Sequence, residues 1–214
     1  MLLGGCGLVQ RAPEEPVNTV ELPTVSDEAA DTLLIDLRRL DSTLVIDMRY
    51  ATANNFTRAP LPGYQANKAY LRAEAAAALA VVSSDLRAQG YGLKIFDAYR
   101  PVRASEAMVT WVLRNNRADL LRDGYIATRS RHNLGVAVDL TLVVLANNAE
   151  VTMGTPFDYF SPAAHTANAR GQIARNRQLL KRTMERQGFA NYDKEWWHFS
   201  YEVENPVRID RVID

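Results

Sequence analysis

One stretch near the middle of the chain constrains the fold most, because it alternates apolar and polar residues as a strand does. Residues 137–144 read AVDLTLVV. Successive side chains of a strand point to opposite faces, so Val138, Leu140 and Leu142 share one face, which must be the core face. Asp139 then lies on the opposite face of a central strand. An unpaired carboxylate is costly in that position, so we expect Asp139 to face a cation.

The residues before this strand add a second metal-ligand candidate. Residues 130–139 read SRHNLGVAVD, which places His132 seven residues before Asp139. Gly135 lies between them and lets the backbone turn, so that both side chains can converge. The segment therefore predicts a His and an Asp directed at one point.

Composition limits which other groups can complete such a site. The 214 residues include one cysteine, Cys6, and three histidines, His132, His165 and His198. One cysteine excludes an intramolecular disulfide and a Cys-rich zinc site, so histidines and carboxylates must hold any metal. The 25 Lys and Arg balance 25 Asp and Glu, which gives no support for a nucleic-acid partner. No apolar run approaches the ~20 residues of a transmembrane segment.

The third ligand candidate is His198, in the segment 195–198, which reads EWWH. Two imidazoles and one carboxylate form the ligand set of a catalytic zinc site, which leaves the fourth position for water. Zinc lowers the pKa of that water to ~7. Glu195, three residues before His198, is then placed to act as general base and to return the proton to the leaving amine. His165 has no partner at ligand spacing, so we expect it in a loop at the rim.

Helix and strand signals follow one another irregularly, without regular βαβ units, which favours an α+β fold. An Ala-rich segment followed by Gly90 predicts one helix, and Gly188 is placed to end another. The predicted helices span 71–89, 102–117 and 173–187, and the predicted strands span 44–46, 93–97, 137–144 and 197–203.

The first thirty residues differ from the rest and predict a flexible leader and linker, with one domain over 31–214. Residues 11–24 carry three prolines and no helical period. Residues 3–6, LGGC, resemble a bacterial lipoprotein cleavage box, in which Cys6 becomes a lipid anchor; a chance cluster is the equal alternative. Lipidation predicts a place in the cell envelope, as a periplasmic protein or lipoprotein. Without lipidation we expect a cytoplasmic protein.

The motifs together resemble the zinc D-alanyl-D-alanine dipeptidases of the VanX type, which belong to the hedgehog/DD-peptidase fold group. The resemblance rests on SxHxxGxAxD and EWWH, and it covers about residues 47–201 in the same order. Further matching stretches are residues 50–57, 90–93, 97–101 and 153–158.

The resemblance implies a single α+β domain with a small, mostly antiparallel sheet flanked by helices. It implies one Zn²⁺ per chain, held by His132, Asp139 and His198. It assigns Glu195 as the general base for a metal-activated water. Arg100 is implied to polarise the scissile carbonyl, and a guanidinium suits this role because it stays charged near neutrality.

The implied substrate is a small zwitterionic dipeptide, D-Ala-D-Ala. Asp158 is implied to bind the substrate ammonium, with Tyr50 and Ser130 completing the pocket. A D,D- or L,D-carboxypeptidase acting on peptidoglycan stem peptides is an alternative, although the match around Asp158 favours the dipeptidase. A non-catalytic zinc-binding module is a further alternative. Glu195 and Arg100 argue against it, because a structural site needs neither a base nor an oxyanion donor.

Overall fold

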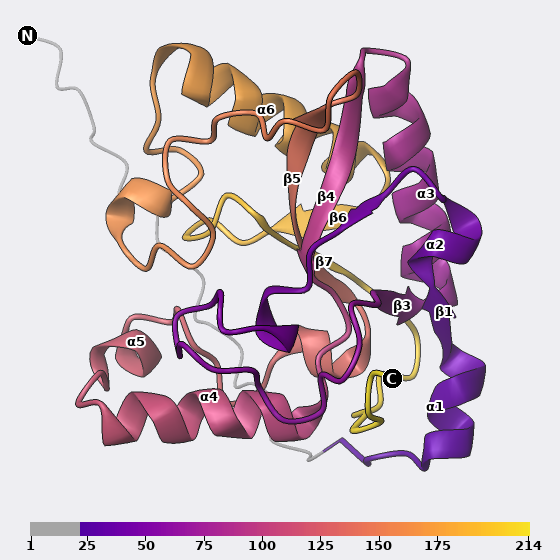
Figure 1. Cartoon of the computed structure of the whole chain (residues 1–214), viewed down its shortest axis with the longest axis vertical. Coiled ribbons are helices and arrows are strands. Elements are labelled where there is room, and N and C mark those ends of the chain that lie inside the picture. The colour runs from indigo at the N-terminus through magenta and orange to yellow at the C-terminus, as the bar shows by residue number, and fades with distance from the viewer. Residues whose placement is uncertain (1–21) are drawn as a thin grey trace, which may run out of the picture.

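The alternating segment forms β5 (Ala137–Val144), the middle strand of a five-stranded sheet in the computed structural model, which describes residues 22–214. Strands β2 (Val45–Ile46) and β4 (Tyr91–Asp97) run parallel, and every other neighbouring pair of this sheet runs antiparallel. This confirms the predicted α+β fold with a mostly antiparallel sheet. Figure 1 shows these strands crossing the centre of the molecule. The sheet order is β2, β4, β5, β7 (His198–Tyr201) and β6 (Phe189–Asn191).

Both faces of β5 are covered. Val138, Leu140 and Leu142 are fully buried, as their spacing predicts. Asp139 and Thr141 on the other face are also buried, at 3% and 1% exposure. The carboxylate of Asp139 therefore lies inside the protein rather than on a solvated face, and its charge needs partners there.

The two long helices α3 (Ala73–Arg87) and α6 (Gly171–Arg186) form one layer against the sheet, because they contact each other as well as β4 and β6. Figure 1 shows α4 (Val102–Arg114) at the opposite end of the molecule, beside α5 (Asp119–Arg122). The remaining elements are α1 (Asp27–Leu33), α2 (Leu37–Leu40), β1 (Leu34–Asp36), β3 (Tyr70–Arg72) and the 3₁₀ turns η1 (Arg49–Ala51), η2 (Arg131–Leu134) and η3 (Pro162–Ala164).

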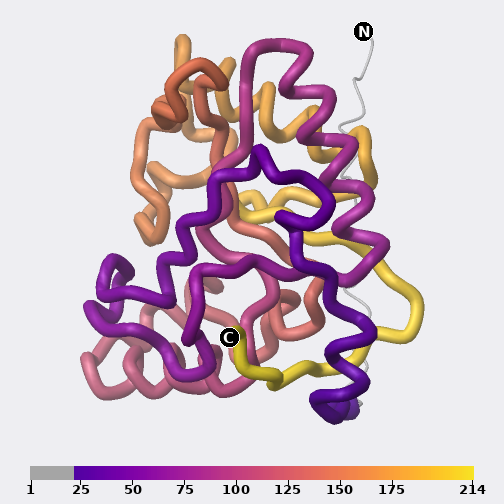
Figure 2. The backbone as a smooth tube through the Cα atoms, turned by 45° about the vertical axis from the view of Figure 1, so that its right-hand side comes forward, coloured from indigo at the N-terminus to yellow at the C-terminus, as the bar shows by residue number. Residues whose placement is uncertain are grey.

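The N-terminal boundary lies earlier than residue 31, which falls inside α1. Ser26 caps this helix and Ala30 is buried. The backbone of Val25 donates to Arg208, and Figure 2 shows the C-terminal segment running close to α1. Residues 22–30 therefore belong to the folded domain. The predicted leader up to residue 21, with Cys6, lies outside the described residues. Within residues 22–214 no helix is long and apolar enough to cross a bilayer.

The turn predicted at Gly135 has a left-handed backbone, with a φ of +68°. A Cβ added there would lie 2.9 Å from Leu34 Cδ2. We expect Gly135→Ala to lower the free energy of unfolding by about 2–4 kcal/mol, from backbone strain and overpacking. Gly90 is the matched control, because its φ is +83° but nothing lies within 4 Å of an added Cβ.

Urea unfolding of both variants tests this prediction. Gly90→Ala adds backbone strain without overpacking, so its free energy of unfolding should fall by only about 1 kcal/mol. Equal losses in the two variants would contradict the steric argument at Gly135.

Candidate active site

The sheet itself brings two of the predicted metal ligands together. Asp139 on β5 pairs in register with His198 on β7, and Asp97 on β4 lies opposite Asp139 on the other side. Neighbouring strands place such paired side chains within about 5 Å of each other. His198 Nδ1 lies 2.9 Å from Asp139 Oδ1.

The third ligand, His132, comes from η2, the 3₁₀ turn that precedes β5. Ser130 caps this turn, its Oγ accepting from the backbone N–H of His132 at 3.3 Å, and Gly135 ends it. His132 Nδ1 lies 2.6 Å from the carbonyl oxygen of Ala98. A carbonyl only accepts, so Nδ1 carries a proton, and Nε2 is the ring nitrogen left to bind a metal. A hydrogen bond from the ring nitrogen that does not bind the metal commonly fixes the orientation of a metal-ligating histidine.

The three side chains fit a divalent metal ion. His132 Nε2 lies 3.1 Å from His198 Nδ1 and 3.4 Å from Asp139 Oδ2, and one ligand atom from each residue lies within 4.8 Å of the others. Burial would raise the pKa of the Asp139 carboxyl, but His132 and His198 outweigh this effect and hold the pKa below its ordinary value. Asp139 is therefore a charged carboxylate. Two imidazoles and a carboxylate match the ligand preference of Zn²⁺.

Arg100 lies beside this group, three residues after β4 ends. Its Nη2 lies 2.7 Å from Asp97 Oδ2 and 3.8 Å from Asp139 Oδ2, and its guanidinium stacks over the Tyr50 ring at 5.0 Å. Burial is the largest effect on Arg100 and opposes its charge, yet the neighbouring groups, Asp97 first among them, together outweigh burial and raise the pKa of the guanidinium. Arg100 is thus a fixed, charged donor at the site.

Glu195 lies in the turn between β6 and β7 and is buried. Its backbone carbonyl accepts from the N–H of His198, which ties the turn to the start of β7. Burial raises the pKa of the Glu195 carboxyl well above its ordinary value, and the charges of Asp139 and Asp158 raise it further. A cation held by the three ligands would oppose this effect. A carboxyl with a raised pKa suits exchange of a proton near neutral pH.

Asp158 closes one side of the site with an unusual backbone, at a φ of +59°. The hydroxyl of Tyr50, on η1, donates to both carboxylate oxygens of Asp158, at 3.0 and 3.1 Å. Burial, followed by the charge of Asp139, raises the pKa of Asp158 to about 8. A cation arriving next to Asp158 would supply the counter-charge that this partly buried carboxyl lacks.

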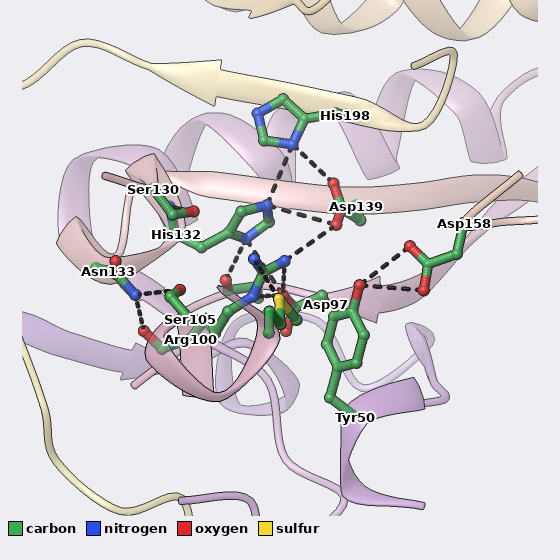
Figure 3. A network of polar contacts seen from close by, with 12 residues as sticks. Tyr50, Asp97, Arg100, Ser105, Ser130, His132, Asn133, Asp139, Asp158 and His198 are labelled. Carbon is green, nitrogen blue, oxygen red and sulfur yellow. Dashed lines mark hydrogen bonds and ion pairs between the residues drawn. The ribbon is translucent and has the colours of Figure 1, made fainter. Parts of the chain in front are cut away.

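All eight predicted site residues line one cavity of about 480 Å³. Figure 3 shows the ligand group between Ser130 on one side and Asp158 on the other. Their roles stay predictions, but their meeting in one cavity follows from the fold. The residues are Tyr50, Arg100, Ser130, His132, Asp139, Asp158, Glu195 and His198.

Sequence reasoning missed Asp97, which is fully buried behind the site. Its carboxylate accepts from Tyr64 at 2.5 Å and from Arg100, and it lies 3.5 Å from His132 Nδ1. The signal was an acid at the end of an apolar strand, in the DAYRP segment. His165 lies next to Tyr125, a residue of the cavity wall, with 3.0 Å between His165 Nε2 and the Tyr125 hydroxyl, as expected for a rim residue.

Comparison with known proteins gives the family. The model of the M15 peptidases, described as D-Ala-D-Ala dipeptidase, matches residues 30–212. The chain belongs to this D-Ala-D-Ala dipeptidase family. It is 37% identical over 169 residues to the D-alanyl-D-alanine dipeptidase of Enterococcus faecium, covering 72% of this chain and 83% of that protein. It is 34% identical over 173 residues to the enzyme of the same name from Streptomyces coelicolor, and the match covers 74% of this chain and 86% of that protein.

Solved structures also resemble this member of the family. The D,D-dipeptidase VanXYg in complex with a D-Ala-D-Ala phosphinate analogue matches with a TM-score of 0.41 and 18% identity, covering 79% of this chain and 66% of that chain. The LD-carboxypeptidase LdcB matches with a TM-score of 0.42 and 20% identity, covering 62% and 59%.

Proposed function

We propose that the protein is a zinc-dependent dipeptidase that hydrolyses D-Ala-D-Ala. The observation that carries the proposal is one cavity that holds a three-residue ligand group, a buried glutamate, a buried arginine and a separate acid. The separate acid, Asp158, suits the free ammonium of a dipeptide. Relatives at 34–37% identity are named D-alanyl-D-alanine dipeptidase, which supports the same substrate.

His132, Asp139 and His198 would hold one Zn²⁺ per chain. The bound ion would act as a Lewis acid, which makes water a stronger acid and polarises a carbonyl oxygen. The residues of this chain fix the position of the three ligand side chains. The backbone carbonyl of Ala98 orients the His132 ring, and the register between β5 and β7 holds Asp139 beside His198.

Glu195 would move the proton. As a base it takes a proton from the attacking water, and as an acid it gives that proton to the nitrogen of the departing D-alanine. Its burial beside Asp139 and Asp158 raises its pKa, which favours the acid step, and the cation in the ligand group would lower that pKa for the base step. Arg100 would donate to the carbonyl oxygen while negative charge develops on that oxygen, and Asp97 holds the guanidinium in place.

Asp158 distinguishes a dipeptide from a longer peptide. In a stem peptide, an amide rather than an ammonium would face this partly buried carboxyl, which would leave it without a counter-charge. We expect Asp158→Ala to lower kcat/KM for D-Ala-D-Ala by about 10- to 100-fold, the value of a charge-assisted hydrogen bond. Asp158→Asn keeps the shape of the side chain and removes its charge, so it should lower kcat/KM for D-Ala-D-Ala by a similar factor.

The readout for Asp158 is the comparison between D-Ala-D-Ala and its N-acetyl derivative. The acetylated dipeptide has no ammonium, so its kcat/KM should change little in the Asp158 variants. An equal loss on both substrates would contradict the anchor role.

Turnover of D-Ala-D-Ala, L-Ala-L-Ala and a pentapeptide stem ending in D-Ala-D-Ala tests the proposed function, with zinc measured in the same sample. We expect the D,D-dipeptide to be cleaved and the other two to be poor substrates. Faster cleavage of the pentapeptide would favour a carboxypeptidase. A zinc-loaded, folded protein without turnover would favour a non-catalytic module.

A further inference from the structure

The second charge of a dipeptide, its carboxylate, needs a cationic partner in the cavity. Asp139, Asp158 and Glu195 all carry carboxyl groups into it. A D-Ala-D-Ala molecule brings its own carboxylate, which these groups repel unless a cation faces it. Given the proposed function, on which this step rests, a side chain of the cavity has to supply that cation.

The layout of the cavity fixes where the substrate carboxylate must point. Figure 3 shows Asp158 on one side of the ligand residues His132 and Asp139, and Ser130 on the other side. In a dipeptide the scissile amide lies between the ammonium and the carboxylate. With the ammonium at Asp158 and the amide at the ligand residues, the carboxylate points toward Ser130.

Three arginines line the cavity, and two of them are already engaged. Arg100 is held by Asp97 and stacks on Tyr50. Arg131 Nη2 donates to the carbonyl oxygen of Tyr201 at 2.7 Å and pairs with Glu202 at 2.8 Å. Neither guanidinium is free to turn toward a ligand beside Ser130 without losing these contacts.

The third arginine, Arg129, directly precedes Ser130 in the chain. It is exposed and contributes to the cavity wall. Among the partners that residues 22–214 provide, none forms a hydrogen bond or ion pair with its side chain. Its guanidinium therefore keeps all of its donors for a ligand, and its fork geometry matches a carboxylate.

We propose that Arg129 binds the C-terminal carboxylate of the dipeptide. The enzyme then reads both ends of its substrate, with Asp158 at the ammonium and Arg129 at the carboxylate. It follows that a free C-terminus is a requirement, and that peptides with an amidated C-terminus are discriminated against at Arg129.

Kinetics of Arg129→Ala with D-Ala-D-Ala and with D-alanyl-D-alaninamide test this proposal. We expect the KM for D-Ala-D-Ala to rise about 10- to 100-fold, because a charge-assisted contact is lost. The amide has no carboxylate, so its kcat/KM should change less than about twofold. Arg129→Lys keeps the charge but not the forked guanidinium, so its KM for D-Ala-D-Ala should lie between those of the wild type and Arg129→Ala.

The matched control is Arg182→Ala on α6, which removes the same charge from an exposed position outside the cavity wall. It should leave the kinetics of both substrates unchanged. An equal loss on acid and amide, or an unchanged KM for D-Ala-D-Ala, would overturn the role of Arg129 alone. Absence of D-Ala-D-Ala turnover in the zinc-loaded wild type would overturn the proposed function and this inference with it.

Discussion

Glu195→Gln should lower kcat for D-Ala-D-Ala by about 10²- to 10⁴-fold, the usual contribution of a positioned general base. Glutamine has the shape of glutamate but can neither accept a proton from water nor return one to the leaving amine. The KM should change little, because the residues placed at the two ends of the substrate are intact. Steady-state kinetics, with zinc measured on the same preparation, check both parts of this expectation.

Zinc content separates loss of the base from loss of the site. Glu195 is outside the ligand group, so the variant should bind as much zinc as the wild type, with one ion per chain expected for both. Glu185→Gln on α6 is the control, because Glu185 pairs with Lys181 within that helix. Wild-type turnover in Glu195→Gln would refute the base assignment, and a loss of zinc would make Glu195 a structural residue.

The meeting of His132 and Asp139 was predictable from the sequence because its signals are local. Alternation along 137–144 predicts the whole of β5, and Gly135 predicts the left-handed turn before it. These short-range patterns place His132 and Asp139 at one point. The long helices were likewise predicted within a few residues, since each has a continuous helical composition ended by glycine or polar residues.

Pairings between distant segments were not predictable in this way. Helix α3 begins at Ala73 rather than residue 71, because residues 70–72 pair with β1 instead. Besides the nearby Arg100, Asp97 contacts Tyr64 and His132, each more than thirty residues away. Local patterns carry no information on such contacts, which form only when the sheet assembles.

Arg129 and Arg131 illustrate the same limit within the site. Both belong to the short segment TRSRH and look equivalent in the sequence. They differ in the structure, because Arg131 donates a hydrogen bond to the carbonyl oxygen of Tyr201 at the end of β7. Arg129 has no such partner within residues 22–214, and this difference depends on a strand seventy residues away.

His132→Ala should abolish zinc binding and reduce D-Ala-D-Ala turnover to background. The variant removes one of three ligands and also breaks the contact with the carbonyl of Ala98, so the remaining Asp139 and His198 cannot form a closed ligand set. Zinc content by inductively coupled plasma mass spectrometry and turnover on the same sample are the measurements. His198→Ala provides a second ligand variant in case burial of His132 makes its replacement unfold the protein.

The third histidine makes this prediction specific. His165→Ala removes an imidazole that contacts Tyr125 and lies outside the ligand group, so it should retain zinc. Chelation should lower the Tm of the wild type and of His165→Ala, because a metal that binds only the folded state stabilises it. The Tm of His132→Ala should not respond to chelator. If His165→Ala lost zinc while His132→Ala kept it, the ligand assignment would be wrong and the metal would lie at the rim of the cavity.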